Sequence, residues 1–202
     1  MPSQPQLKGI SAAPGLAQGA AFWVDASAIV NSADSLEPTI DLSEALALAS
    51  SQLVELMERI AGEEAEILEF QLAMLEDEAL SDPVRQAVAA GTTLIEAWQQ
   101  TLDEHVTDYE QSEDEYFQAR ASDLRDIRER VLRILLGETE AEIPEGAILL
   151  STDLTPSRFL SLDWNKGGGV VLREGSPSSH VAMLARSRGA VSYTHLRAHE
   201  TH

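Results

Sequence analysis

One histidine, His180, stands at the start of a short helical segment among residue types that suit phosphoryl chemistry. Pro177 fixes its own φ angle, and Ser178 and Ser179 can each cap a helix by accepting hydrogen bonds from its first N–H groups. His180 then falls in the first helical turn, where the helix dipole and the unpaired amides favour an anion. This position suits a neutral imidazole that acquires a phosphoryl group better than it suits an imidazolium.

Phosphoryl transfer asks a protein mainly to position the reacting groups and to stabilise charge. An imidazole nitrogen attacks phosphorus when it is neutral, which the ordinary histidine pKa of about 6.5 permits. Ser179 and the backbone amides of the first helical turn are predicted to hold the phosphoryl oxygens. Arg186 lies further along the same helix, and it either reaches the phosphoryl group or anchors the domain. Taken alone, a histidine beside a helix cap is more often a structural or surface residue.

The segments around this helix alternate between strand-like and helical patterns. A glycine-rich run at 167–172 and the apolar run 146–150 each predict a strand, and residues 156–162 predict a short helix. Alternating strands and helices of this kind predict a compact α/β domain. Residues 7–30 also predict short strands, because glycine and proline punctuate them. These early strands have no sheet of their own, so we expect them to pair with the strands after residue 146.

The middle of the chain, residues 41–142, follows a helical period instead. Leucine, alanine, methionine and isoleucine recur three and four positions apart from Leu46 onward. Capping boxes at 93–96 and 112–115, and a proline start at Ser81-Asp82-Pro83, predict where further helices begin. The pattern is typical of a bundle of antiparallel helices inserted into the α/β domain.

The acidic charge is concentrated in the same helical region. Of the formal net charge of −20, residues 41–142 carry −19, with 26 acidic and 7 basic side chains. A surface of this sign disfavours a nucleic acid partner and favours a basic protein partner, whose encounter it would steer. The alternative is that these charges only solvate the helix surfaces.

The remaining composition predicts a soluble, cytoplasmic protein. The chain has no cysteine, which excludes disulfides and thiolate metal sites. Its N-terminus lacks the apolar run of a signal peptide, and no apolar stretch approaches the length of a membrane span. No membrane association is therefore expected.

Several motifs together resemble one protein family. The chain is similar to the N-terminal half of enzyme I of the bacterial phosphotransferase system, a phosphoenolpyruvate–protein phosphotransferase. The matching segments, in order, are residues 9–15, 74–78, 121–127, 153–157 and 175–186. The resemblance implies an α/β swivelling phosphohistidine domain with an inserted all-α helical-bundle domain that binds the carrier protein HPr. The implied boundaries are 1–38 and 143–191 for the first, 39–142 for the second, and 192–202 for a non-native or disordered tail.

The resemblance also implies a phosphoryl relay. His180 would accept the phosphoryl group of phosphoenolpyruvate as a phosphohistidine and pass it to a histidine of HPr, with Ser179, Gly175 and Arg186 in support. The implied HPr-docking residues are Glu69, Met74, Leu75, Glu78, Tyr116 and Arg120.

The family's phosphoenolpyruvate-binding barrel would follow residue 191, and this sequence does not contain it. In the family that barrel binds Mg²⁺ and the full-length protein is a homodimer. We therefore expect this chain to bind no metal, to be a monomer, and to be competent only for phosphoryl exchange with HPr.

Two departures from the family pattern concern the loop and the end of the chain. Ser176 and Pro177 replace more usual residues before the histidine, so the loop is expected to be stiffer. The segment 192–202 matches nothing in the family. His195, His199 and His202 have a metal-like spacing, but nothing nearby would complete a site.

Two other functions compete with this one. The chain would be the swivelling domain of a phosphoenolpyruvate synthase or pyruvate phosphate dikinase, although the acidic insertion argues against it. Alternatively, it would be a non-enzymatic helical interaction module. The sequence leaves open whether the relay serves sugar uptake, nitrogen regulation or a dihydroxyacetone kinase.

Overall fold

The computed structural model describes residues 7–24, 37–60, 62–139 and 142–198. The chain forms two compact units. An α/β unit consists of Met1–Ala26, Ala141–Leu154 and Arg158–His202. A helical unit consists of Ser27–Glu140 together with Thr155–Ser157. The helical unit therefore interrupts the α/β unit in the sequence, as the change of periodicity predicts.

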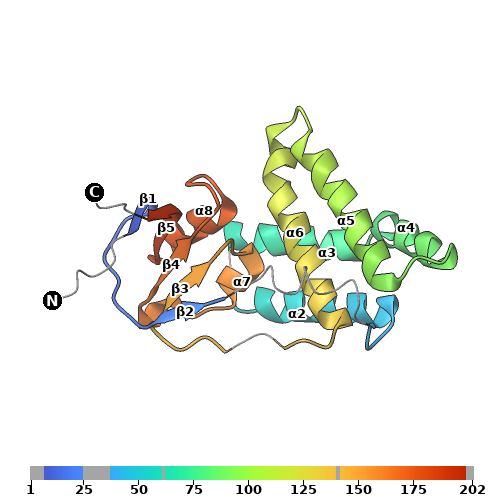
Figure 1. The fold of residues 1–202 in the computed structure, drawn as a ribbon, viewed down its shortest axis with the longest axis horizontal. Helices are drawn as coiled ribbons and strands as arrows, with labels where there is room; N and C mark the ends of the chain where they lie inside the picture. Colours follow the sequence, from blue (N-terminus) through green and yellow to red (C-terminus); the bar gives the residue numbers. More distant parts are fainter. Residues whose placement is uncertain (1–6, 25–36, 61, 140–141, 199–202) are drawn as a thin grey trace. The chain divides into compact units, whose positions relative to one another are not determined.

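The α/β unit is built on a mixed sheet of five strands in the order β1-β5-β4-β3-β2 (Figure 1). The strands are β1 Leu7–Ala13, β2 Ala21–Trp23, β3 Ile148–Ser151, β4 Gly169–Leu172 and β5 Val191–Ala198. β2, β3, β4 and β5 run parallel, whereas β1 pairs with β5 antiparallel. Both early strands thus join the sheet made by the later ones, in agreement with the sequence prediction.

Glycine allows the close approach of backbones where β4 begins. Gly168 has a φ of +103°, and a Cβ at this position would lie 2.6 Å from the carbonyl oxygen of Ala147. A side chain would meet backbone there, which explains why glycines precede the apolar strand. β4 then buries Val170 and Leu172 in the core of the unit.

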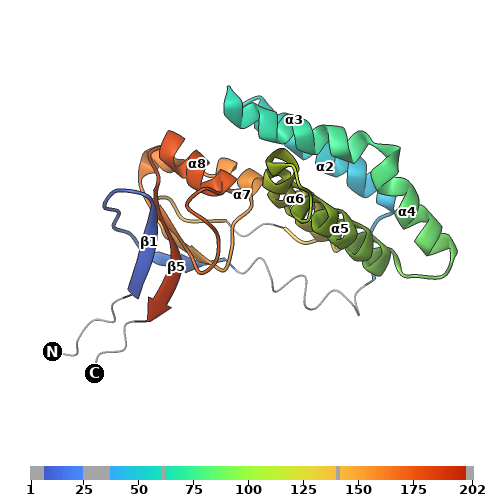
Figure 2. The same ribbon diagram turned by 90° about the horizontal axis from the view of Figure 1, so that it is seen from above.

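Three short helical segments follow β3 in the sequence. α7 spans Pro156–Leu160, a 3₁₀ helix spans Trp164–Lys166, and α8 spans His180–Ser187. α8 contacts β1 and β5 (Figure 2) and buries Val181, Leu184 and Ala185. The apolar half of α8 is therefore fixed on the sheet, and its first residue is held with it.

The helical unit contains five helices in the described part of the chain. They are α2 Leu42–Met57, α3 Glu63–Glu76, α4 Glu78–Ala89, α5 Leu94–Glu110 and α6 Glu115–Leu135. α6 contacts α2, α3 and α5, and its core face includes Leu124, Ile127 and Leu132. Trp98 of α5 is fully buried beside α6 and donates from Nε1 to the carbonyl of Arg128 at 3.1 Å.

The predicted helix start at Ser81-Asp82-Pro83 is wrong. α4 begins at Glu78, because Asp77 caps it by accepting from the N–H of Ala79 at 2.8 Å. Pro83 lies inside α4. A proline marks a permitted helix start but does not exclude an earlier one when a better cap precedes it.

A polar cluster is buried in the helical unit. The carboxylate of Asp126 accepts from Gln71 Nε2 at 3.0 Å and from the N–H and hydroxyl of Ser157, both at 2.7 Å. Arg130 donates to the same hydroxyl at 2.6 Å and to Gln52 Oε1 at 2.8 Å. Asp126 and Gln71 are fully buried, and Ser157 is nearly so. The carboxylate thus accepts three hydrogen bonds, which is what a buried charge requires.

The prediction of a disordered tail from residue 192 is wrong for residues 192–198, which belong to β5. Tyr193 and Thr194 are residue types that favour strands, and β5 pairs with both β1 and β4. His199 and His202 lie outside the described residues. That the segment is non-native stays a prediction.

β5 nevertheless fits its place imperfectly. Ser192 and Thr194 are buried, and their hydroxyls have no hydrogen-bond partner among the described residues.

Replacing Thr194 with valine removes an unpaired buried hydroxyl at constant shape, so we expect it to stabilise the α/β unit by about 1–2 kcal/mol. Urea denaturation measures the gain. The half-buried neighbour Tyr193→Phe should change stability by less than about 0.5 kcal/mol. A destabilised Thr194→Val protein would contradict this account of the strand.

No helix in the described ranges is both long enough and apolar enough to cross a membrane.

Candidate functional site

His180 is the first residue of α8, and Ser179 caps the helix as the sequence predicts. The Ser179 backbone is extended, and its hydroxyl accepts from the N–H of Ala182 at 3.2 Å. Its carbonyl accepts from the N–H of Met183 at 3.0 Å. The first N–H groups of any helix lack a carbonyl partner within the helix, and the N–H of Val181 is one of these in α8. The imidazole therefore leaves the helix at its positive end, and the side chain is half-buried.

A tight turn leads into the helix. The N–H of Ser179 donates to the carbonyl of Ser176 at 3.0 Å, with Pro177 at the second position of the turn. The hydroxyls of Ser176 and Ser178 lie 2.8 Å apart, and Ser176 Oγ also accepts from the N–H of Ser178 at 3.2 Å. Ser178 therefore stabilises the turn, and the capping role belongs to Ser179. Ser176 and Pro177, the loop residues that depart from the family pattern, both contribute to this closed turn.

Gly175 precedes the turn with a φ of +101°, which disfavours other residues. A Cβ there would have room, with Leu172 Cδ1 at 3.7 Å and Asp153 Oδ1 at 3.8 Å as its nearest neighbours. Glycine is thus required by the backbone angle rather than by crowding.

Among the described residues Arg186 has no ion-pair partner, and its side chain contacts two backbone carbonyls. Its Nη1 donates to the carbonyl oxygen of Ala12 in β1 at 2.7 Å and to that of Pro177 at 2.9 Å. Of the two roles that the sequence leaves open, these contacts favour anchoring. They hold the guanidinium against the turn that precedes His180.

The docking residues implied by the resemblance lie in the helical unit. Glu69 and Glu78 are exposed, Met74 is half-buried, and Tyr116 is 54% exposed. Leu75 is buried in the core of the unit with only 4% exposure, so it offers little surface to a partner in this structure. Its docking role stays a prediction.

Arg120 is held in an aromatic cluster rather than extended into solvent. Its guanidinium carbon lies 4.8 Å from the ring centroid of Phe70 and 5.1 Å from that of Tyr116. It also pairs with the buried carboxylate of Asp123 at 3.2 Å. Tyr116 and Arg120 are visible in the sequence as an i, i+4 pair, whereas Phe70 comes from α3 and carries no signal that connects it to them.

Further aromatic contacts extend the cluster along α6. Phe117 packs edge-on against Tyr116 and Tyr109, with centroid distances of 5.6 and 5.2 Å. Burial raises the pKa of Tyr109, and the nearby Tyr116 and Asp77 raise it further. Phe117 is 40% exposed. Tyr116 and Phe117 thus form a partly exposed aromatic surface, and Asp77 lies near Tyr109 at its side.

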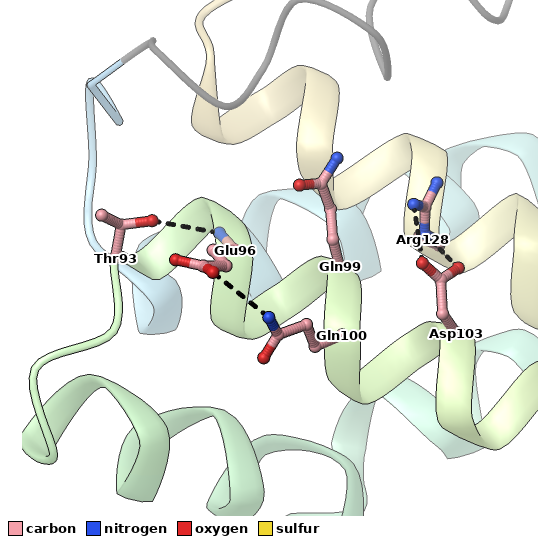
Figure 3. Close-up of a pocket in the computed structure, with 6 residues that line it drawn as sticks. All are labelled: Thr93, Glu96, Gln99, Gln100, Asp103 and Arg128. Atoms are coloured by element: carbon pink, nitrogen blue, oxygen red, sulfur yellow. Dashed lines mark hydrogen bonds and ion pairs between the residues drawn. The ribbon is translucent and has the colours of Figure 1, made fainter.

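A separate groove lies between α5 and α6 (Figure 3), with a volume of about 540 Å³. Its lining residues are Thr93, Glu96, Gln99, Gln100, Asp103 and Arg128. The polar groups largely pair with one another: Gln100 donates to Glu96 at 3.2 Å, and Arg128 Nε lies 2.9 Å from Asp103 Oδ1. None of the residues predicted for the phosphoryl or docking sites lines this groove.

Comparison with known proteins gives the family. Residues 8–120 match the family described as PEP-utilising enzyme, N-terminal, and residues 143–192 match PEP-utilising enzyme, mobile domain. The chain belongs to the PEP-utilising enzyme family. The second match contains His180 and its turn, and the first contains most of the helical unit. The resemblance to enzyme I inferred from the sequence is confirmed.

Relatives with curated names agree. A phosphoenolpyruvate-protein phosphotransferase of Listeria monocytogenes is 34% identical over 194 residues, which cover 90% of this chain and 34% of the relative. The phosphoryl donor subunit DhaM of a PEP-dependent dihydroxyacetone kinase of Escherichia coli is 39% identical over 121 residues, covering 54% and 25%. The chain thus spans about a third of the length of the first of these relatives.

A solved structure supports the same assignment. A solution structure of Enzyme I (nEIt) matches 94% of this chain and 82% of its own with a TM-score of 0.70 and 25% identity. This similarity in fold extends over almost the whole of the present chain.

Proposed function

We propose that this chain is a phosphohistidine relay, in which His180 exchanges a phosphoryl group with a histidine of an HPr-type carrier. The observation that carries the proposal is the position of His180 as the first residue of α8, capped by Ser179, within the match to the mobile domain. The relatives named phosphoenolpyruvate-protein phosphotransferase and phosphoryl donor subunit support the same chemistry.

The proposed step is a transfer between two imidazoles. A neutral imidazole nitrogen of His180 attacks phosphorus as the N–P bond to the carrier histidine breaks, so one phosphoramidate replaces another. The phosphoryl oxygens then face the N-terminus of α8, where the N–H of Val181 and the helix dipole favour their charge. Ser179 contributes by fixing the first turn through Ala182. Position and charge stabilisation are the main demands of this reaction.

The helical unit, residues 39–142 in the sequence prediction, is proposed as the surface that binds the carrier. Exposed Glu69 and Glu78 supply negative charge, and Met74 and Tyr116 supply apolar contact area. The guanidinium of Arg120 lies 5.1 Å from the ring centroid of Tyr116 and would help to hold that ring in place. Such a surface fits a basic carrier, whose association the acidic charge of this region would accelerate.

The donor side of the relay is proposed to lie outside these 202 residues. In the full-length family a barrel domain would bind phosphoenolpyruvate and Mg²⁺. The isolated chain is proposed to bind no metal and to be a monomer. It would therefore exchange phosphoryl groups with the carrier but not take them from phosphoenolpyruvate.

Labelling of the wild-type chain tests this proposal. Incubation with ³²P-labelled phospho-HPr should transfer an acid-labile, alkali-stable label to the chain. Incubation with labelled phosphoenolpyruvate and Mg²⁺ should give none. A correctly folded chain that phospho-HPr leaves unlabelled would refute the proposal, and direct labelling by phosphoenolpyruvate would refute the assignment of the donor to a separate domain.

A further inference from the structure

Arg186 joins two parts of the α/β unit that are far apart in the sequence. The same nitrogen, Nη1, donates to Ala12 in β1 and to Pro177 in the turn before His180, at 2.7 and 2.9 Å. Arg186 itself lies in the last turn of α8. One side chain thus connects the sheet, the turn and the helix.

The turn has few other connections. Within residues 176–179 the hydrogen bonds are local: Ser179 donates to the Ser176 carbonyl, and Ser176 pairs with Ser178. In the part of the chain that the structure describes, no other hydrogen bond from Ser176, Pro177 or Ser178 leaves the segment 175–186. Arg186 therefore provides the hydrogen-bonded link between this turn and β1.

The charge of Arg186 is also notable. Among the described residues, no carboxylate forms an ion pair with its guanidinium, and both carbonyl acceptors are neutral. Its positive charge consequently stays available to the region around the first turn of α8. A guanidinium also holds several donors in a fixed plane, which an ammonium does not.

We propose that Arg186 is a positioning residue for phosphoryl transfer: by linking the turn at Pro177 to β1, it fixes where the His180 imidazole meets the phosphorus atom. This inference rests on the proposed function of His180. Arg186 acts through the turn and does not take part in bond making. Displacing a reacting group by about 1 Å can lower a rate by about 10²-fold, which sets the size of the expected effect.

The test compares Arg186→Met and Arg186→Lys with wild type and with the control Arg173→Met. Arg173 is an exposed arginine of the same unit. The first measurement is the rate constant for labelling at saturating phospho-HPr, together with the carrier concentration that gives half the maximal rate. We expect Arg186→Met to lower the rate constant about 10- to 100-fold and to leave the half-saturating concentration within about twofold. Arg186→Lys should be intermediate, because one ammonium replaces a planar fork, and Arg173→Met should equal wild type.

The second measurement does not depend on phosphoryl transfer. Amide hydrogen exchange of residues 176–182 should become faster in Arg186→Met, with the exchange of the helical unit unchanged. Labelling of Arg186→Met at the wild-type rate would overturn the inference while leaving the relay function intact. A loss seen only in the half-saturating concentration would also overturn it. If the wild-type chain is not labelled, the relay function fails, and the exchange rates alone decide whether Arg186 holds the turn. If Arg186→Met does not fold, the same criteria apply to Arg186→Lys.

Discussion

Replacement of His180 by alanine is expected to abolish labelling by phospho-HPr, a loss of more than about 10³-fold. The variant lacks the nucleophilic nitrogen, and no other group at the N-terminus of α8 replaces it. Ser179 is committed to the N–H of Ala182. The hydroxyls of Ser176 and Ser178 are hydrogen-bonded to each other. The assay is transfer of acid-labile ³²P at several carrier concentrations.

Two further variants separate chemistry from folding. His180→Gln keeps a polar side chain of similar length at the first position of α8 but cannot form a phosphohistidine. It should fold as wild type and remain unlabelled. His105→Ala removes a half-buried histidine of α5 in the helical unit and should retain labelling within about twofold. If His180→Gln acquires acid-labile label at the wild-type rate, another residue accepts the phosphoryl group, and the assignment of His180 as the acceptor is contradicted.

The sequence predicts the local part of this site well. A helix N-cap depends on the residue type and on neighbours within three or four positions. The cap at Ser179 and the start of α8 can therefore be predicted from the sequence alone. The pairing of β1 and β2 with later strands is also predictable, because unpaired strands must find a sheet. The same local reasoning places the start of α4 at Pro83 and misses Asp77 as a cap.

What the sequence does not predict depends on contacts across the fold. The carbonyl of Ala12 is an acceptor for Arg186 only because α8 packs on β1. Phe70 reaches Arg120 only because α3 lies beside α6. Burial of Leu75 beside exposed acidic neighbours follows from the face that α3 turns toward the core. A contact with a backbone carbonyl or an aromatic face does not constrain the residue type at the partner's position. The hydrophobic periodicity of the sequence therefore cannot reveal such contacts.

The tail shows a different limit. The lack of family resemblance predicts a disordered segment, but strand formation requires only extended backbone, suitable residue types and an unpaired strand edge in the sheet. The place between β4 and β1 accepts residues 191–198. The mismatch remains visible as two buried hydroxyls without partners.

Asp126→Ala is expected to destabilise the helical unit by about 3–5 kcal/mol, the range for removing one partner of a buried charged network. Three donors lose their acceptor: the amide of Gln71, and the N–H and hydroxyl of Ser157. Arg130 would still donate to the Ser157 hydroxyl. That hydroxyl would no longer have a carboxylate to which it can donate its own proton. Each buried donor left unpaired costs about 1–3 kcal/mol, so the sum reaches the upper part of this range.

Urea denaturation followed by circular dichroism at 222 nm measures this loss, because the helical unit supplies most of the helix signal. Asp82→Ala is the matched control. Asp82 also pairs with an arginine of its own unit, Arg85 at 3.3 Å, but both side chains are about half exposed, at 55% and 49%. That pair should contribute less than about 1 kcal/mol. Asp126→Asn keeps the size of the side chain, and its amide presents donors to groups that are themselves donors, so it should recover little of the loss. Equal stabilities for Asp126→Ala and Asp82→Ala would show that the buried network adds nothing beyond a surface pair.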